Sequence, residues 1–124
     1  MVQSMNTLRF PSGAPGRSRT VVSRGLVWTV ANTTNRDSDF NVQVRQSLKM
    51  LESHLVEAGS DRHHILSVQA ILSDIGTREA FDRRWQEWIG DEPAHWPQRA
   101  CFQSALAPGL QIELVVTAET ISSE

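Results

Sequence analysis

An apolar residue recurs every three or four positions between Phe40 and Leu55, and this spacing constrains the fold more than any other feature of the sequence. It predicts one apolar face on a helix that runs to about Ala58 and ends at Gly59. Asp37 or Ser38 can accept hydrogen bonds from the first free amides of this helix. A helix of this kind needs a second layer to cover its apolar face. That face consists of Phe40, Val44, Leu48, Leu51 and Leu55.

The remaining segments supply the second layer, because most of them have the residues and alternation of β-strands. A second helix is predicted from Thr77 to Gly90, with Phe81, Trp85, Trp88 and Ile89 as its apolar stripe. The order β-β-β-α-β-α-β-β predicts an α+β two-layer sandwich, in which two helices cover one face of a sheet of about six antiparallel or mixed strands. The other face, with its Val, Trp and Cys residues, is expected to pack on a partner subunit. The predicted strands are 6–10, 19–23, 26–31, 64–73, 99–104 and 110–116.

Length and charge limit the organisation of the chain and its partners. With 124 residues we expect a single domain over 1–124, and the net charge of −2 argues against a nucleic-acid partner. No apolar run approaches the roughly 20 residues that cross a bilayer, so no membrane span is expected. Cys101 has no second cysteine to pair with, and no leader pattern is evident at the start. We therefore expect a cytoplasmic protein.

The segment 99–116 carries the strongest candidates for chemistry, and it is interpreted as two strands joined by a turn at Pro108 and Gly109. Alternation places Arg99 and Cys101 on one face of the first strand and removes Glu113 from the apolar stripe of the second. Arg99 and Glu113 can therefore face one site, where the guanidinium holds a carboxylate and the carboxylate moves a proton. The alternative is that both are ordinary exposed strand residues in solvated or paired faces.

Cys101 and the pair His63 and His64 are candidates for two other kinds of site, a catalytic thiol and a metal centre. Cys101 is interpreted as a structural thiol, since the sequence places neither a base nor an orienting group beside it. His63 and His64 are adjacent at the start of a strand, so they point to opposite faces, and no third ligand is suitably spaced. No metal site is therefore predicted. The loop 91–97 carries Trp96 just before Arg99 and is expected to form a rim over the site.

Three stretches of the sequence resemble the YjgF/RidA family, the reactive intermediate deaminases, also described as UK114-like. The resemblance extends over roughly 18–118. It implies one domain with a chorismate-mutase-like fold, assembled as a homotrimer around a central barrel with clefts between neighbouring subunits. The three stretches are Gly25-Leu26-Val27-Trp28-Thr29; the unit from Val44 through Ala58-Gly59 and His64-Ile65-Leu66 to Phe81; and Pro97-Gln98-Arg99-Ala100-Cys101 with Leu110-Gln111-Ile112-Glu113.

The resemblance also implies an activity. The enzymatic members of this family hydrolyse reactive enamines and imines to 2-oxo acids and ammonia, without metal or cofactor. On this chain, Arg99 would bind the carboxylate of a small 2-imino acid, the main chain around Cys101 would orient the substrate, and Glu113 would activate the attacking water. Each role suits the chemistry of its residue.

Four residues of the expected site differ from the family pattern. Val30 and Ala31, or Thr29 and Val30 if the alignment shifts by one residue, stand where Ser and Gly are common. Arg17 beside Ser18 replaces an aromatic residue, and Asp82 replaces a common Asn on the second helix. We hypothesise that Arg17 adds a cation that favours a ligand with two anionic groups, against the ordinary reading of a surface Arg. The departures leave a second function open, a non-catalytic trimer that binds a small carboxylate as a sensor or partner protein.

Overall fold

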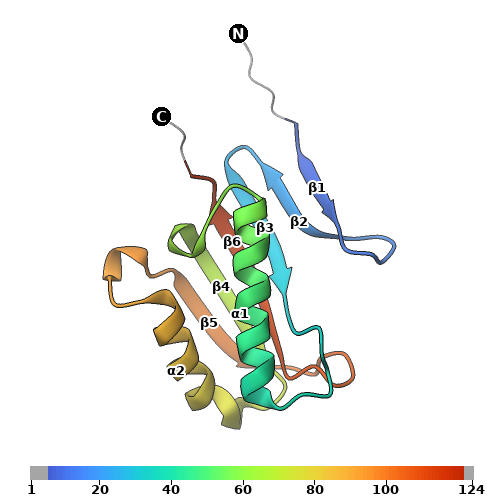
Figure 1. The fold of residues 1–124 in the computed structure, drawn as a ribbon, viewed down its shortest axis with the longest axis vertical. Helices are drawn as coiled ribbons and strands as arrows, with labels where there is room; N and C mark the ends of the chain where they lie inside the picture. The colour runs from blue at the N-terminus through green and yellow to red at the C-terminus, as the bar shows by residue number, and fades with distance from the viewer. Residues whose placement is uncertain (1–5, 122–124) are drawn as a thin grey trace.

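The computed structural model of the chain describes residues 6–121 as one sheet with two helices (Figure 1). Short 3-10 turns at Arg62–His64, Ile75–Thr77 and Pro93–His95 lie in the connections. The order of elements is the predicted one, β-β-β-α-β-α-β-β. The elements are β1 (Leu8–Pro11), β2 (Ser18–Ser23), β3 (Leu26–Ala31), α1 (Phe40–Glu57), β4 (Ile65–Leu72), α2 (Arg78–Ile89), β5 (Gln98–Gln103) and β6 (Ile112–Glu119).

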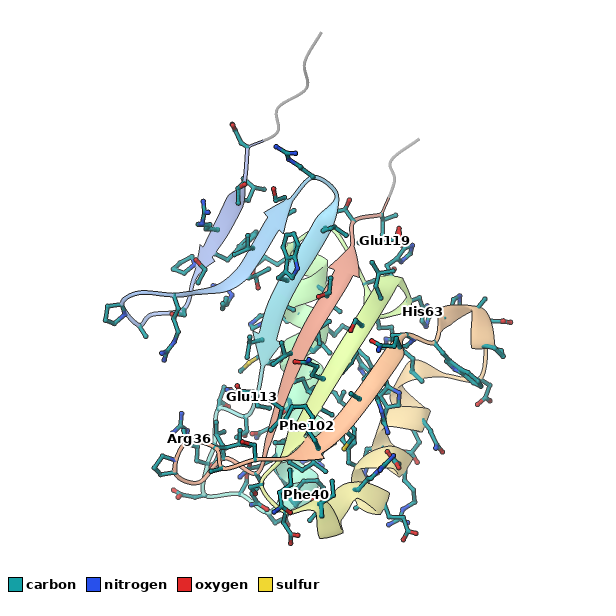
Figure 2. The ribbon with its side chains drawn as sticks, turned by 180° about the vertical axis from the view of Figure 1, so that it is seen from behind. Arg36, Phe40, His63, Phe102, Glu113 and Glu119 are labelled. Atoms are coloured by element: carbon teal, nitrogen blue, oxygen red, sulfur yellow. The ribbon has the colours of Figure 1, made fainter. Side chains whose placement is uncertain are left out.

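The six strands form one mixed sheet in the order β1-β2-β3-β6-β4-β5. All neighbouring strands are antiparallel except β4 and β5, which run parallel. Both helices lie on the same face of this sheet, as the two views show (Figures 1 and 2). This arrangement confirms the predicted α+β sandwich.

Local sequence explains how the two helices begin and end. Asp39 caps α1, because its carboxylate accepts a hydrogen bond from the Val42 amide at 2.9 Å. Gly59, with φ of 85°, ends α1 in the left-handed conformation that was predicted. The predicted cap of α2 is wrong in detail, since the Thr77 hydroxyl donates to the Asp74 carbonyl at 2.6 Å and does not cap the helix.

The core lies between the helices and the alternate residues of the central strands that face them. Phe81, Leu51 and Leu55 are the largest of its fully buried side chains. From α2, Trp85 and Ile89 are buried and Trp88 packs against the cluster from its edge, so the predicted apolar stripes of both helices are confirmed.

The strands β5 and β6 are not neighbours, which corrects the expectation that a tight turn joins them. A turn does occur, since the Leu110 amide donates to the Ala107 carbonyl at 2.9 Å, but β4 lies between the two strands. The cause is α2, which carries the chain from β4 back to the start of a parallel β5 at the sheet edge. Sequence alternation does not reveal such a crossover.

The sheet face away from the helices exposes several apolar side chains. Trp28 and Phe102 are each 42% exposed, and Val30, two residues after Trp28 on β3, lies on the same face. Cys101 was expected on this face as well, but it packs against the core on the helix side. Neither helix within residues 6–121 is long and apolar enough to cross a membrane.

Candidate functional site

A hollow of about 690 Å³ opens at one end of the sheet, where three loops meet. The loops are the β1–β2 connection, the β3–α1 connection and the segment between β5 and β6. Figure 2 shows Glu113 at this end of the sheet, beside the loops that carry Arg36. A volume of this size is typical of small-molecule sites. The lining includes Arg17, Arg19, Val30, Asn32, Arg36, His54, Leu106, Leu110 and Glu113.

Glu113 is the only carboxylate among the described residues that line the hollow. It lies on β6 opposite Ile71 of β4, and its neighbours Ile112 and Leu114 point into the core. One carboxylate oxygen accepts a long hydrogen bond of 3.4 Å from the Asn32 side chain. The second oxygen makes no hydrogen bond within residues 6–121 and is available to a ligand or water.

Three arginines from two loops and β2 line the same hollow. Arg19 is paired with Glu57 of α1 and also donates to the Pro11 carbonyl at 2.7 Å. Arg36 donates to the Pro108 carbonyl at 3.3 Å, and the Arg17 guanidinium has no partner in the described part of the chain. The hollow therefore holds two guanidinium groups that no acidic side chain of the described structure offsets.

Gln43 of α1 holds the loops of the hollow together, although sequence reasoning did not single it out. Its side chain is fully buried, and its amide donates to the carbonyls of Gly109 at 3.0 Å and Ser38 at 3.2 Å. Its amide oxygen accepts from the Gln111 main chain at 2.9 Å. A glutamine inside an apolar helical stripe was the available signal, because buried amides are retained where they bond to main chain.

His54 is the second residue of this region that sequence reasoning missed. It is 9% exposed and lines the hollow from α1. Its Nδ1 lies 3.1 Å from the Thr29 hydroxyl, which lies 2.8 Å from the Thr20 hydroxyl. Burial lowers the pKa of His54 below its ordinary 6.5, and the charge of Arg19 lowers it further. The imidazole is therefore neutral at pH 7.

Arg99 lies outside the hollow, on the opposite face of the sheet from Glu113. It pairs in register with buried Val68 and points toward α2, where its Nη2 contacts Asp82 Oδ1 at 2.6 Å. Its guanidinium also lies 5.1 Å from the ring of Phe81 and 5.7 Å from that of Trp85. The expectation that Arg99 and Glu113 of one chain face the same site is thus wrong, because their strands are in a register that alternates them to opposite faces.

The structure does not bring the other predicted site residues together in one place. Val30 lines the hollow with Arg17 and Glu113, whereas the Ala31 side chain is fully buried in the core. Cys101 lies on the helix side near Arg99, and burial raises the pKa of its thiol. Trp96 is exposed in the loop before β5, where its indole N–H donates to the Gly90 carbonyl at 2.9 Å.

Comparisons with known proteins give the family. A family model described as Endoribonuclease L-PSP matches residues 12–120. The structure also superposes on NMB1025, a member of the YjgF protein family from Neisseria meningitidis, with a TM-score of 0.86 and 26% identity, over 96% of this chain and 98% of that one. The chain belongs to the YjgF/RidA family.

Sequence relatives within the YjgF/RidA family are distant. A RutC family protein of Haemophilus influenzae is 29% identical over 61% of this chain and 65% of its own length. The RutC family protein YoaB of Escherichia coli K12 is 24% identical over 82% of this chain and 88% of its own length. Rv2704 of Mycobacterium tuberculosis is described as a member of the YjgF/YER057c/UK114 family. It shares the fold with a TM-score of 0.80 and 21% identity, over 93% of this chain and 100% of that one.

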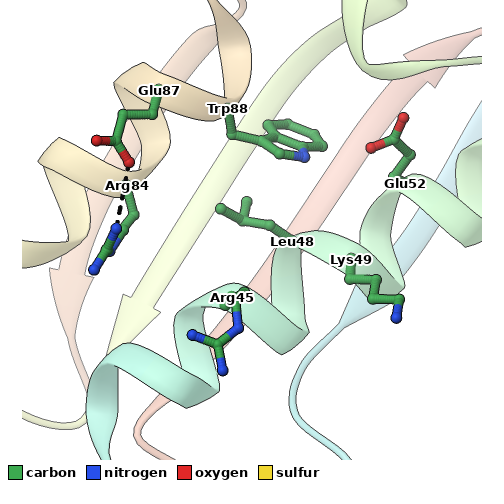
Figure 3. Close-up of a pocket in the computed structure, with 7 residues that line it drawn as sticks. All are labelled: Arg45, Leu48, Lys49, Glu52, Arg84, Glu87 and Trp88. Atoms are coloured by element: carbon green, nitrogen blue, oxygen red, sulfur yellow. Dashed lines mark hydrogen bonds and ion pairs between the residues drawn. The ribbon is translucent and has the colours of Figure 1, made fainter.

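This YjgF/RidA chain has a second hollow of about 380 Å³ between its two helices (Figure 3). Leu48 and Trp88 form the apolar part of the lining, and Arg84 of α2 is paired with Glu87 at 3.5 Å. None of the residues predicted for the site lines it. Within residues 6–121, no group of three or more His, Cys, Asp or Glu side chains is placed to share a metal ion.

Proposed function

We propose that this YjgF/RidA protein hydrolyses 2-imino acids to 2-oxo acids and ammonia. The observation that carries the proposal is Glu113, a carboxylate with one unengaged oxygen, in a hollow that also holds unpaired guanidinium groups. Such a carboxylate can hold a water molecule and accept its proton, while the cations attract an anionic substrate. The reaction needs no redox partner, because water is its only co-reactant.

In the proposed reaction the Glu113 carboxylate accepts a proton as the water oxygen attacks the C=N carbon. Glu113 passes this proton to the nitrogen, which gives a neutral carbinolamine with one new C–O bond. The hydroxyl proton then moves to the nitrogen, by way of Glu113, as the C–N bond breaks; ammonia leaves, and the oxygen becomes the carbonyl oxygen of the 2-oxo acid. Asn32, which donates to Glu113 at 3.4 Å, helps to orient the carboxylate.

The substrate carboxylate is proposed to bind to Arg99 of a neighbouring protomer. Arg99 and Glu113 lie on opposite faces of one sheet, so they can contact the same small molecule only if two copies of the chain meet. Asp82 engages one nitrogen of the guanidinium and holds it in place, which leaves other donors for a bidentate contact. In this arrangement the Cys101 main chain and Trp96 border the same cleft.

A homotrimer is the assembly that we propose, in keeping with the family resemblance. The open face of the sheet supports it, because Trp28, Val30 and Phe102 would otherwise leave apolar surface in water. The chain supplies the second copy itself, so each interface would form one complete site from two incomplete halves. Cytoplasmic location remains our expectation for this protein.

The test follows the loss of imines made in place by an amino-acid oxidase. We expect the wild-type protein to accelerate hydrolysis of 2-iminopropanoate, and Glu113→Gln to reduce the rate about 100-fold or more, the range of general-base catalysis. Arg99→Ala should raise KM strongly, whereas Glu119→Gln, an exposed carboxylate on the same strand, should match wild type. A folded wild-type protein that accelerates none of several imines would contradict the proposal.

The Asp82–Arg99 pair favours one alternative, a protein that binds a small carboxylate without turnover. An Asp in ion contact at 2.6 Å offsets part of the charge that an incoming carboxylate would meet. Saturable binding of pyruvate without any imine hydrolysis would identify this binder. RNA cleavage, which the name of the family model suggests, is not expected of a chain with net charge −2.

A further inference from the structure

The hollow around Glu113 contains more positive charge than a monocarboxylate substrate requires. Its Arg17 and Arg36 guanidiniums have no acidic partner within residues 6–121, whereas Arg19 is paired with Glu57. In the proposed site, Arg99 already supplies the contact to the carboxylate next to the imine. Arg17 and Arg36 then remain as two further cations beside a single Glu113.

The fold presents both arginines, whose side chains are exposed, at the hollow. The Ser12 hydroxyl donates to the Arg17 carbonyl at 2.9 Å and fixes the loop that presents this side chain. On the other side, Gly109 packs so closely on Arg36 that an added Cβ would lie 2.8 Å from the Arg36 Cβ. Arg36 also donates to the neighbouring Pro108 carbonyl at 3.3 Å. The two guanidiniums therefore lie on opposite loops of one hollow.

Two cations that share a hollow repel each other, and an anion between them removes this repulsion. The volume of about 690 Å³ leaves room for a substrate longer than a three-carbon acid. A second carboxylate on the substrate would supply the missing negative charge at the end of the molecule remote from Arg99. Arginine suits this role, because its planar fork binds carboxylates in a defined direction.

We propose that the preferred substrate is a 2-imino dicarboxylate of four or five carbons, with its distal carboxylate bound by Arg17 and Arg36. This inference rests on the proposed function, since it assigns the substrate class of the same site. The reaction is balanced by water alone: the imine and water give the 2-oxo dicarboxylate and ammonia. Enzymes that oxidise the α-amino group of acidic amino acids, or that eliminate a β-substituent from them, produce imines of this class.

The experiment compares two imines with the same reacting group. D-Aspartate oxidase acting on D-aspartate supplies 2-iminosuccinate, and D-amino-acid oxidase acting on D-alanine supplies 2-iminopropanoate. We expect kcat/KM of the wild-type protein to be about tenfold higher for the dicarboxylate, because its second carboxylate gains contacts with two guanidinium groups. Equal values, or a preference for 2-iminopropanoate, would overturn the inference and leave the proposed hydrolase intact.

Single substitutions then test which arginines cause the preference for the dicarboxylate. Arg17→Gln and Arg36→Gln should each lower the ratio of the two kcat/KM values about tenfold, whereas Arg83→Gln, an exposed arginine on α2, should leave it unchanged. An unchanged ratio in both hollow variants would overturn the assignment of the distal carboxylate to these residues.

Binding of reaction products separates failure of the inference from failure of the hydrolase. If neither imine is hydrolysed, calorimetry with oxaloacetate and pyruvate tests the same hollow without turnover. Tighter binding of oxaloacetate that is lost in Arg17→Gln and Arg36→Gln would support the dicarboxylate site while the hydrolase is rejected. Equal affinity for the two acids would overturn the dicarboxylate site as well as the hydrolase.

Discussion

His54 places an ionisable side chain where water scarcely reaches, at the inner wall of the hollow. Its contact with Thr29, and that of Thr29 with Thr20, satisfies three buried polar groups in one chain of hydrogen bonds. Arg19 lies close enough to disfavour a proton on the imidazole. The folded protein therefore retains a neutral histidine in conditions where an exposed one would be charged.

This neutral state makes the stability of the protein depend on pH. The pKa of His54 is lower in the folded protein than in the unfolded chain, where it is near 6.5. As pH falls below that value, the unfolded chain binds a proton that the folded protein does not, so the free energy of unfolding decreases. We expect His54→Gln to lose less stability than wild type between pH 7.5 and pH 5, measured by urea denaturation. Equal losses in the two proteins would contradict this prediction.

The sequence was informative for residues whose environment depends on strand alternation. The position of Glu113 outside the apolar stripe of its strand could be predicted, because its neighbours Ile112 and Leu114 are apolar. The contacts of Gln43 with Gly109 and Gln111, and of His54 with Thr29, could not be predicted, since these partners come from segments far along the chain. Gln111, for example, is 68 positions from the Gln43 side chain that accepts its amide hydrogen bond.

At the scale of elements, the turn between β5 and β6 determines where the wall of the hollow lies. Gly109 has φ of 84° and approaches the β3–α1 connection at Arg36. A side chain at this position meets both a strained backbone and a closely packed neighbour, because its Cβ would lie 3.1 Å from the Arg36 carbonyl oxygen. Together with the hydrogen bonds of Gln43 and Arg36, this contact joins the two loops that carry Arg36 and Leu110.

Gly109→Ala should therefore be more destabilising than an alanine at another glycine with positive φ. Gly13 is the matched control, because its φ is 85° and an added Cβ there meets no atom within 4 Å. We expect Gly109→Ala to lose about 1–3 kcal/mol more than Gly13→Ala in urea denaturation, from crowding against Arg36, because the positive φ strains both variants alike. Equal losses would show that the Arg36 contact does not constrain the turn.

Element type and order followed from periodicity, but strand pairing did not. The stripes of α1 and α2 and the alternation in β4 and β6 are local signals, which the structure confirms. The position of β5 depends instead on how α2 crosses the sheet, a long-range feature with no local sequence signal. Because the sequence did not reveal this crossover, Arg99 and Cys101 were expected on the open face of the sheet, whereas they lie on the helix side.

For the whole molecule, the separation of Arg99 and Glu113 on two faces has a direct experimental test. Arg99→Ala lacks one half of the proposed site and Glu113→Gln lacks the other, so each variant alone should be nearly inactive. Equal amounts of the two, unfolded and refolded together, should recover about a quarter of wild-type imine hydrolysis, because one interface in four then has both residues intact.

A single-chain site would give no recovery, since every chain in the mixture carries a defect. Refolding each variant by itself is the control for activity regained through refolding alone. Sedimentation of the mixture should show the same assembly as wild type. Recovery in a mixture that remains monomeric would contradict the shared site.

A site divided between opposite faces of the sheet also ties activity to abundance. In the proposed assembly, a lone protomer would keep Glu113 in its hollow and Arg99 held by Asp82, and would still lack a complete site. By mass action, dilution below the dissociation constant of that assembly would then abolish activity without unfolding the protein. The concentration of the protein in its compartment would thus set the turnover rate per chain. This form of control requires no effector molecule.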